Sequence, residues 1–364
     1  MQNPQADLGF MQMALELASG ATIATSPNPK VGCVLVKNGM IIGRGWTQPV
    51  GQAHAEVQAL RDALAQGFDV RGATAYVSLE PCSHFGRTPP CANALIDAGL
   101  VRVVAAIEDA NPQVAGRGLA LLRNAGVVVE CGLLAQQARE MNIGFFKRME
   151  TGLPWVRMKV AASLDGITAL PNGNSQWITE LAARQDGHVW RARADAILTG
   201  IGTVLADDPQ MNVRGIEMPR QPQKYVVDTH LRTPVSAKIL LNAGATVVCA
   251  DAAAAKRHLL EQAGAEVLRL PDQTGKVDLP ALMLELGRRH INELHVEAGA
   301  KLNGALIGQE CVDELLIYLA PKLLGRGAGL FDFPELQMVA QAKKLTFHEV
   351  IQLDQTLRIL ARFC

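Results

Sequence analysis

The sequence predicts an α/β protein with two domains. Helix-like and strand-like patterns alternate through the first 150 residues, and the alternation starts again after about residue 147. The chain has 364 residues, whereas a single hydrophobic core stops growing at roughly 250–300 residues. Hydrophobic residues make up 49% and charged residues 19% of the chain, a composition typical of folded domains.

The first domain is expected to contain a layer of largely buried strands between helices. Apolar positions recur at helical spacing over residues 8–19, and further helices are expected over 56–65, 92–98 and 119–124. Strands are expected over 31–36, 40–42, 75–79, 101–107 and 127–129. Asn38-Gly39 is a typical turn for a hairpin between the first two strands.

A second domain is expected to follow a break at Gly152-Leu153-Pro154, which places the boundary within residues 147–154. We assign residues 1–149 to the first domain and 150–364 to the second. Strands are expected over 155–161, 196–198, 225–227, 246–249, 266–268, 293–296 and 314–319, and helices over 179–193 and 279–290. Two β-like runs around residues 352–355 predict a terminal hairpin.

Composition excludes several classes of function. Lys plus Arg and Asp plus Glu both number 35, so the chain has no excess positive charge for a nucleic-acid backbone. We see no apolar run that approaches the ~18–20 residues needed to span a bilayer, and the first basic residue, Lys30, comes late for a signal peptide. Seven cysteines favour reduced thiols over a disulfide framework. These features predict a cytoplasmic protein without membrane or nucleic-acid partners.

One group of residues in the first domain suits a zinc ion: His54, Cys82 and Cys91, with Glu56 close to the histidine in sequence. One imidazole and two thiolates leave a fourth tetrahedral position for water. Zinc lowers the pKa of such a water, and Glu56 is the nearby carboxylate that could carry protons. Taken singly, each ligand has a simpler interpretation as a buried small residue or a core histidine.

Helix geometry restricts where this metal site lies. Residues two apart do not share one side of a helix, so His54 and Glu56 converge only beyond the N-terminal end of a helix. Cys91 follows Pro89-Pro90 and is expected to begin another helix. Positive helix ends favour thiolates over thiols. The remaining cysteines, at 33, 131, 249, 311 and 364, lack such neighbours and are expected to be structural.

The order His-x-Glu and then Pro-Cys…Cys is the signature of zinc nucleobase deaminases, although their usual spacer between the cysteines is two residues and here it is eight. Residues 25–32, 54–56 and 80–91 resemble the deaminase half of the bifunctional riboflavin-biosynthesis deaminase–reductase family, which has the eight-residue spacer. Residues 109–118 resemble it too, except that the family more often has proline in place of Ala110. The resemblance continues through both domains.

The resemblance implies a cytidine-deaminase-like zinc domain in which His54, Cys82 and Cys91 bind Zn²⁺ and Glu56 moves protons. Asn28, in a Pro-Asn-Pro turn, would hold the pyrimidine ring through a donor and an acceptor; a rigid turn without a further role is the alternative. His84 and Arg87 would contact the ring edge or the sugar phosphate, or else are solvated loop residues.

The second domain gives weaker signals of its own. Gly200-Ile-Gly202 fails as a dinucleotide fingerprint, because the third glycine would fall at Leu205. Residues 297–304 follow an apolar strand, precede a helix-like stretch and contain glycines, as a phosphate-binding turn does. A plain turn explains this segment equally well.

Residues 159–166, 175–179, 202–209 and 297–299 are similar to the reductase half of the same family. The resemblance implies a dihydrofolate-reductase-like fold with a mainly parallel sheet, and NADPH as cofactor. The implied cofactor-binding residues are Ala161, Trp177, Thr203, Asp207, Thr229, Gly299, Ala300, Lys301, Leu302, Asn303 and Gly304. The implied substrate-binding residues are Lys159, Ser175, Arg191, Met211, Arg214 and Glu297. Arginine suits a phosphate because its planar fork binds two oxygens at once, although Arg191 and Arg214 would also suit a solvated surface.

The leading hypothesis is a two-step enzyme acting on a pyrimidine ribosyl phosphate: hydrolytic deamination of 2,5-diamino-6-ribosylamino-4-pyrimidinone 5′-phosphate, then reduction of the ribose to a ribityl chain. Lys159 and Asp207 are the titratable groups to examine in the second step, unless they are structural ion-pair partners. The alternatives are another zinc nucleobase or nucleoside deaminase with an accessory nucleotide-binding domain, and a nucleotide-binding regulatory protein with a structural zinc. The family implies self-association, which we expect to be a homodimer formed through the second domain.

Overall fold

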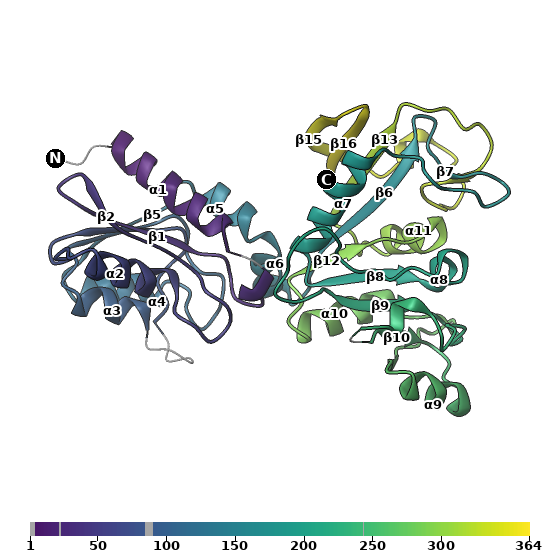
Figure 1. The fold of residues 1–364 in the computed structure, drawn as a ribbon, viewed down its shortest axis with the longest axis horizontal. Coiled ribbons are helices and arrows are strands. Elements are labelled where there is room, and N and C mark those ends of the chain that lie inside the picture. The colour runs from purple at the N-terminus through teal and green to yellow at the C-terminus, as the bar shows by residue number, and fades with distance from the viewer. Residues whose placement is uncertain (1–3, 22, 84–89, 243) are drawn as a thin grey trace. The chain divides into compact units, whose positions relative to one another are not determined.

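The structure is a computed structural model that describes residues 4–21, 23–83, 90–242 and 244–364 (Figure 1). The chain divides into two compact units, Met1–Gly152 and Leu153–Cys364. Among the helices of the described residues, none combines the length and the apolar character that crossing a membrane requires.

The first unit is built on a five-stranded sheet with the order β2-β1-β3-β4-β5. Its strands are β1 (Gly32–Lys37), β2 (Met40–Trp46), β3 (Thr74–Val77), β4 (Arg102–Ala105) and β5 (Val128–Cys131). Strand β1 is antiparallel to both β2 and β3, whereas β3, β4 and β5 are parallel. Its helices are α1 (Pro4–Ser19), η1 (Ile23–Thr25), α2 (Ala55–Ala65), α3 (Cys91–Asp97), α4 (Arg117–Asn124), α5 (Ala135–Met141) and α6 (Ile143–Thr151).

Helices cover both faces of this sheet (Figure 1). Successive residues of each strand point to opposite faces, so neighbouring residues pack against different helices. Leu35 and Val103 pack with residues of α2, α3 and α4. Their neighbours Val34 and Val104 pack with residues of α1 and α5. Both faces are therefore buried, as the apolar strand patterns predict.

Helix α2 lies directly against strand β2. A Cβ added at Gly45 would overlap the carbonyl oxygen of Ala55, and one added at Gly43 would overlap that of Ala59. Only glycine allows this approach of backbone to backbone. Because Ala55 is the first residue of α2, the contact fixes the beginning of that helix, where His54 and Glu56 lie.

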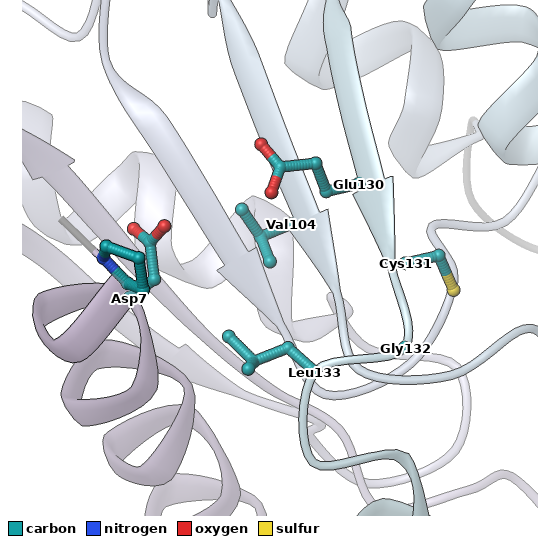
Figure 2. A pocket seen from close by; sticks show the side chains of 7 residues that line it. Asp7, Val104, Glu130, Cys131, Gly132 and Leu133 are labelled. Carbon is teal, nitrogen blue, oxygen red and sulfur yellow. The ribbon is translucent and has the colours of Figure 1, made fainter. Parts of the chain in front are cut away.

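On the other face, a cavity of about 380 Å³ lies between α1 and strands β4 and β5 (Figure 2). Asp7 and Glu130 line it, and both carboxylates are paired with Arg102, at 2.7 and 2.9 Å. The Tyr76 hydroxyl also donates to Asp7. The Asp7 pair therefore fastens α1 to β4, and the Glu130 pair joins β5 to β4.

The second unit contains a nine-stranded sheet with the order β11-β10-β9-β8-β12-β6-β13-β16-β15. The strands from β11 to β13 in that order are parallel, and the terminal hairpin of β16 and β15 adds to them antiparallel. The strands are β6 (Trp155–Ser163), β8 (Ala196–Gly200), β9 (Gln223–Val227), β10 (Thr246–Cys249), β11 (Glu266–Arg269), β12 (Glu293–Val296), β13 (Glu314–Ala320), β15 (Leu345–Leu353) and β16 (Thr356–Phe363). Strands β7 (Ile167–Ala169) and β14 (Ala328–Gly329) form a separate small sheet.

The helices of the second unit are α7 (Leu181–Arg193), α8 (Ile201–Asp207), η2 (Lys238–Leu240), α9 (Ala254–Gln262), α10 (Leu279–Arg288), α11 (Ala300–Gly308) and η3 (Val339–Gln341). Strands β8 and β12 are neighbours in the sheet. After β8 the chain continues through α8 to β9 on one side, and after β12 it continues through α11 to β13 on the other side. Ligands of open α/β sheets bind at such a switch point, beside the carboxyl ends of the strands.

A buried arginine joins three central strands of this sheet. Arg157 of β6 contacts Glu293 of β12 at 2.9 Å and Glu314 of β13 at 2.5 Å. Its guanidinium also lies 4.5 Å from the ring centroid of Trp190 in α7. Two carboxylates and an aromatic face together compensate the burial of the charge.

Each helix and strand expected from the sequence is present, with small differences at the ends. Helices α5, α6, α8 and α9 were not expected. Helix α8 has seven residues and one buried residue, Val204, so it carries no usable periodicity. The expectation that a helix follows residue 304 is wrong in its boundary: α11 begins at Ala300, and Gly304 lies inside it against the backbone of Asp332.

We predict that Gly45→Ala lowers the free energy of unfolding of the first unit by about 1–3 kcal/mol, the usual cost of overpacking. The added Cβ would push the start of α2 away from β2. Hydrogen exchange of the amides of residues 55–65 measures the loss. Gly9→Ala in α1 is the control, because a Cβ there meets nothing within 4 Å; unchanged protection of α2 in the Gly45 variant would contradict the prediction.

Candidate active sites

The three expected zinc ligands of the first unit come together. His54 immediately precedes α2, Cys82 follows β3 in a loop, and Cys91 is the first residue of α3. The Nδ1 atom of His54 lies 3.7 Å from the Cys82 sulfur and 3.3 Å from the Cys91 sulfur, and all three donor atoms lie within 4.8 Å of one another. Ligands of a tetrahedral zinc ion stand about 3.6 Å apart, so this donor set fits the ion.

The start of α3 holds Cys82 in place. The backbone N–H of Cys91 donates to the Cys82 sulfur at 3.3 Å, and the N–H of Ala92 donates to the Cys82 carbonyl at 3.1 Å. Hydrogen bonds from the Cys91 and His54 side chains, opposed by burial, lower the pKa of the Cys82 thiol to about 4. At Cys82 the protein groups alone therefore favour the thiolate form, which binds metals. The same hydrogen bond to Cys82, together with burial, raises the pKa of the Cys91 thiol.

Glu56, the second residue of α2, is 3% exposed. Burial, and next the negative charge of Cys82, raise the pKa of its carboxyl to about 7. A carboxyl with such a pKa both gives and takes a proton near neutral pH. The position of Glu56, one residue from the N-terminal end of the helix that His54 precedes, agrees with the geometry expected from the sequence.

Asn28 lies in a turn that is fastened to the end of the first unit. Its backbone N–H donates to Thr25 at 2.8 Å, and its side chain is half-buried. The Asn142 side chain both accepts from and donates to the backbone of Lys30, at 2.8 Å each. His84 and Arg87 lie outside the described residues, so their expected substrate contacts remain predictions.

In the second unit, the expected binding residues gather at one edge of the sheet. Lys159 and Ala161 lie in the carboxyl-terminal half of β6, Thr203 and Asp207 in α8 directly after β8, Thr229 two residues after β9, and residues 297–304 directly after β12. Strands β9, β8, β12 and β6 are consecutive neighbours in the sheet (Figure 1). Their carboxyl ends therefore present these residues side by side.

Open space remains above two glycines at this edge. A Cβ built on Gly202 or Gly299 meets nothing within 4 Å, whereas one on Gly200 would press on the side chain of Leu302 at 3.1 Å. A phosphate can approach exposed glycine backbone at the start of a helix such as α11. The edge thus fits a nucleotide cofactor.

An ion cluster occupies the centre of the same edge. Both carboxylate oxygens of Glu297 accept from Arg191, the second at 2.8 Å. His295 Nε2 lies 3.2 Å and Lys159 Nζ 4.0 Å from this carboxylate. Burial opposes ionisation, but Arg191 and Lys159 outweigh it and hold the pKa of Glu297 well below its usual range. Two residues that the resemblance assigns to the substrate thus bind each other.

The remaining expected residues differ in exposure. The Trp177 side chain is 63% exposed beneath the Arg184 guanidinium, and its carbonyl accepts from Lys322 at 3.0 Å. Asn303 is buried and donates to the carbonyls of Ala298 and Leu330. Half-buried residues are Ser175, Thr203 and Thr229, and exposed ones are Asp207, Arg214 and Lys301.

Met211 has a buried side chain in the core formed with Ile197, Val204 and Val226. Only its backbone is therefore left to contact a substrate. The sequence does not reveal the roles of Glu80 and Asp165, although both lie inside segments that resemble the family. Glu80 accepts four backbone N–H groups, and Asp165 accepts two, from Leu324 and Gly325. No spacing in the sequence shows such partners.

Comparison with known families separates the same two parts of the chain. The family described as "Cytidine and deoxycytidylate deaminase zinc-binding region" matches residues 4–107. The family described as "RibD C-terminal domain" matches residues 154–358. The riboflavin biosynthesis protein RibD of Escherichia coli is 47% identical over 359 residues, which cover 94% of this chain and 95% of that protein. The chain belongs to the RibD family.

Other RibD proteins agree over the same length. RibD of Haemophilus influenzae is 45% identical, covering 97% of this chain and 96% of that protein. A structure of Acinetobacter baumannii RibD is 43% identical, with a TM-score of 0.91 and complete coverage of both chains. The Thermotoga maritima diaminohydroxyphosphoribosylaminopyrimidine deaminase/5-amino-6-(5-phosphoribosylamino)uracil reductase is 30% identical, with a TM-score of 0.89 and 99% coverage of both.

Membership of the RibD family makes this chain a bifunctional deaminase and reductase of riboflavin biosynthesis. It also confirms the expected fold class, a cytidine-deaminase-like domain followed by a dihydrofolate-reductase-like one. Because the match covers both parts of the chain, it favours the two-step enzyme over the alternatives in which the second domain is only accessory or regulatory.

We predict that the stabilising effect of the Glu297–Arg191 pair disappears in acid. Because the folded-state pKa of Glu297 is lowered, its contribution is complete above the unfolded-state value of about 4.3 and is lost as the pH falls below that value. Glu297→Gln should therefore cost roughly 2–3 kcal/mol at pH 7 and progressively less below pH 4. Urea unfolding followed by tryptophan fluorescence measures this, since Trp155, Trp177 and Trp190 lie in the second unit.

The control is Glu261→Gln, which removes an exposed pair with Arg257 and should cost less than about 0.5 kcal/mol. A cost of Glu297→Gln that stays the same from pH 7 to pH 3 would refute the assignment of that stability to the ion pair.

Proposed function

We propose that the first unit deaminates 2,5-diamino-6-ribosylamino-4-pyrimidinone 5′-phosphate and that the second unit reduces the ribose of the product with NADPH. The observation that carries the proposal is the convergence of His54, Cys82 and Cys91 beside a buried carboxyl, Glu56. The substrate named for the Thermotoga maritima relative supports the choice of pyrimidine.

In the first unit, His54, Cys82 and Cys91 would hold a zinc ion, which activates water for attack when bound. The water oxygen bonds to the ring carbon that carries the amino group, the carbon–nitrogen bond breaks, and ammonia leaves. Glu56 takes a proton from the attacking water and gives it to the departing amino group. Its pKa of about 7, raised by burial, suits both transfers.

Asn28 is proposed to orient the pyrimidine ring. Its amide offers a donor and an acceptor together, and the turn that carries it is held by Asn142 through two hydrogen bonds to Lys30. A ring recognised through both groups is fixed in one orientation, which places the amino group to be lost. His84 and Arg87 remain proposed contacts of the ring or the sugar phosphate.

In the second unit, NADPH supplies a hydride to the anomeric carbon of the ribose when bound. A carbon–hydrogen bond forms, the bond from that carbon to the ring oxygen breaks, and the ring oxygen takes a proton to become a hydroxyl. Of the two titratable candidates, Lys159 and Asp207, we assign the proton donor to Lys159, because its Nζ lies 4.0 Å from Glu297 in the ion cluster. Asp207 is exposed at the end of α8 and is better placed to bind cofactor.

The proposed cofactor contacts are Ala161, Trp177, Thr203, Asp207, Thr229 and residues 299–304, and the proposed substrate contacts are Lys159, Ser175, Arg191, Met211, Arg214 and Glu297. Arg214 supports a phosphate site because its side chain is exposed. Arg191 instead supports an orienting role: it holds Glu297 and donates to the carbonyl of Asn212 at 3.0 Å. A cytoplasmic location remains part of the proposal.

We also propose that two copies of the chain associate through the terminal hairpin. Strand β15 is the last strand of the nine-stranded sheet, and unpaired strand edges attract further strands. Large apolar side chains are exposed in the hairpin, namely Phe347 and Val350 of β15 and Leu357 of β16, and in the segment that precedes it in the chain, namely Met338 and Val339. Such a patch marks an interface, and a second copy offers the same surface in return.

We predict that Glu56→Gln lowers the rate of ammonia release by roughly a hundredfold or more, because the amide cannot carry the proton. NADPH oxidation from the diamino substrate should fall equally, and should return when the deaminated intermediate is supplied. Both rates are followed on one zinc-loaded preparation. Glu16→Gln, at an exposed position of α1, is the control; ammonia release near the wild-type rate in the Glu56 variant would overturn the mechanism.

We predict that Phe347→Lys weakens dimer formation. Phe347 is 70% exposed, and the substitution places a charge on the strand at the edge of the sheet. Sedimentation equilibrium measures the association. Val128→Lys, on the exposed edge of the other sheet, should leave the mass unchanged. A wild-type protein that sediments as a monomer at micromolar concentration disproves the proposed interface.

A further inference from the structure

A buried carboxylate in the first unit, Glu80, takes no part in the proposed chemistry but holds four backbone amides. Its Oε2 accepts from the N–H groups of Asp109 and Gly116, at 3.1 and 2.9 Å. Its Oε1 accepts from those of Gly118 and Leu119, at 2.8 and 3.2 Å. The donors come from a segment about thirty to forty residues further along the chain. Three of them lie within residues 109–118, which resemble the family, and Leu119 follows directly.

This carboxylate caps helix α4 from outside the helix. Gly118 and Leu119 belong to its first turn, whose N–H groups have no partner within the helix itself. A negative charge is favourable at that end, and hydrogen bonds to an ionised acceptor are stronger than neutral ones. Glu80 thus fixes the position of α4 relative to the loop that follows β3.

The same loop carries a zinc ligand two residues later. The carbonyl of Pro81 packs so closely on Gly118 that an added Cβ would overlap its oxygen, and that Cβ would lie 3.2 Å from Glu80 Oε1. On the other side, Cys82 accepts from the N–H groups of Cys91 and Ala92. Residues 80–82 are therefore held between the starts of two helices, α4 and α3.

We propose that Glu80 is a positioning residue for the metal of the deaminase unit. Together with Gly118 it fixes the backbone at Pro81, and so sets the Cys82 sulfur 3.7 Å from His54 Nδ1, a separation suited to a tetrahedral ion. Glu80 acts through the backbone and need not touch metal or substrate. The inference rests on the ligand set of the proposed function, and the experiment below separates the failure of one from the failure of the other.

Glu80→Gln tests this role with little change in size. One carboxylate oxygen becomes an amino group, which cannot accept, so two of the four amides lose their acceptor. We expect the zinc affinity, measured by competition with a chelator, to fall about tenfold, as for other residues that support metal ligands. The visible spectrum of the Co²⁺-substituted protein should change as well, because it reports ligand geometry.

Two controls accompany this variant. Asp62→Asn alters a surface carboxylate that also accepts a backbone N–H, that of Arg44 at 2.8 Å, and should leave zinc affinity and spectrum unchanged. NADPH oxidation from the deaminated intermediate should stay at the wild-type rate in every variant, which shows that the second unit is folded.

Gly118→Ala tests the same contact from α4. Alanine favours a helix more than glycine does, so a loss of zinc affinity cannot come from a weaker helix. The added Cβ would push on the Pro81 carbonyl, and we expect a reduced affinity and an altered Co²⁺ spectrum here too. This variant decides the question if Glu80→Gln does not fold.

Cys82→Ser separates the two possible failures. If it binds zinc as tightly as the wild type, the ligand set itself is wrong. If Cys82→Ser loses zinc while both Glu80→Gln and Gly118→Ala keep wild-type affinity and an unaltered Co²⁺ spectrum, the positioning role is overturned. That result would hold even if the two variants unfold at a lower temperature, because it would reduce Glu80 to a purely stabilising residue.

Discussion

Direct packing of backbone on backbone determines where the proposed zinc ligands of the first unit lie. At Gly45 the sheet touches the carbonyl of Ala55, which places the first turn of α2. At Gly118 the start of α4 touches the carbonyl of Pro81, next to Cys82. No side chain stands between the surfaces, so neither contact can be adjusted by a change of rotamer. The ligands therefore inherit their positions from the packing of helices on the sheet.

In the second unit, the fold brings together residues that are far apart in the chain. Parallel strands place the segments after β6, β8, β9 and β12 at one edge, and a charged cluster then forms there. Glu297 is stable as an anion because Arg191, Lys159 and His295 surround it. If a substrate binds at this edge as proposed, it meets charged groups that are already paired, and it has to replace or extend their ion pairs.

The sequence predicted the parts of this arrangement that depend on local rules. His54 lies just before α2 and Glu56 lies in its first turn, so the sequence predicted that the two side chains meet at the N-terminal end of this helix. Proline before Cys91 predicted the start of α3. The rule that ligands bind beside the carboxyl ends of parallel strands agrees with the location of the proposed binding residues of the second unit. Short helices with one buried residue, such as α8 and α9, have too little pattern to be seen.

Long-range partners were beyond prediction because nothing in the spacing encodes them. Glu297 and Arg191 stand 106 residues apart, and either alone is typical of a solvated surface. The four donors to Glu80 are backbone groups, which every residue possesses, so its role is visible only once α4 is in place. The burial of Met211 likewise follows from tertiary packing rather than from its neighbours in the chain.

The order of strands in the larger sheet also has a consequence during synthesis. Strand β6 is the first strand of its unit to leave the ribosome, yet its two neighbours are β12 and β13, at residues 293–296 and 314–320. The ion pairs of Arg157 likewise form only after Glu293 and Glu314 have been synthesised. The centre of this sheet therefore closes only when most of the unit has been translated, whereas β1 finds β2 after a turn of two residues. Long-range pairing of this kind is slow, so the deaminase unit has time to fold while its neighbour is still incomplete.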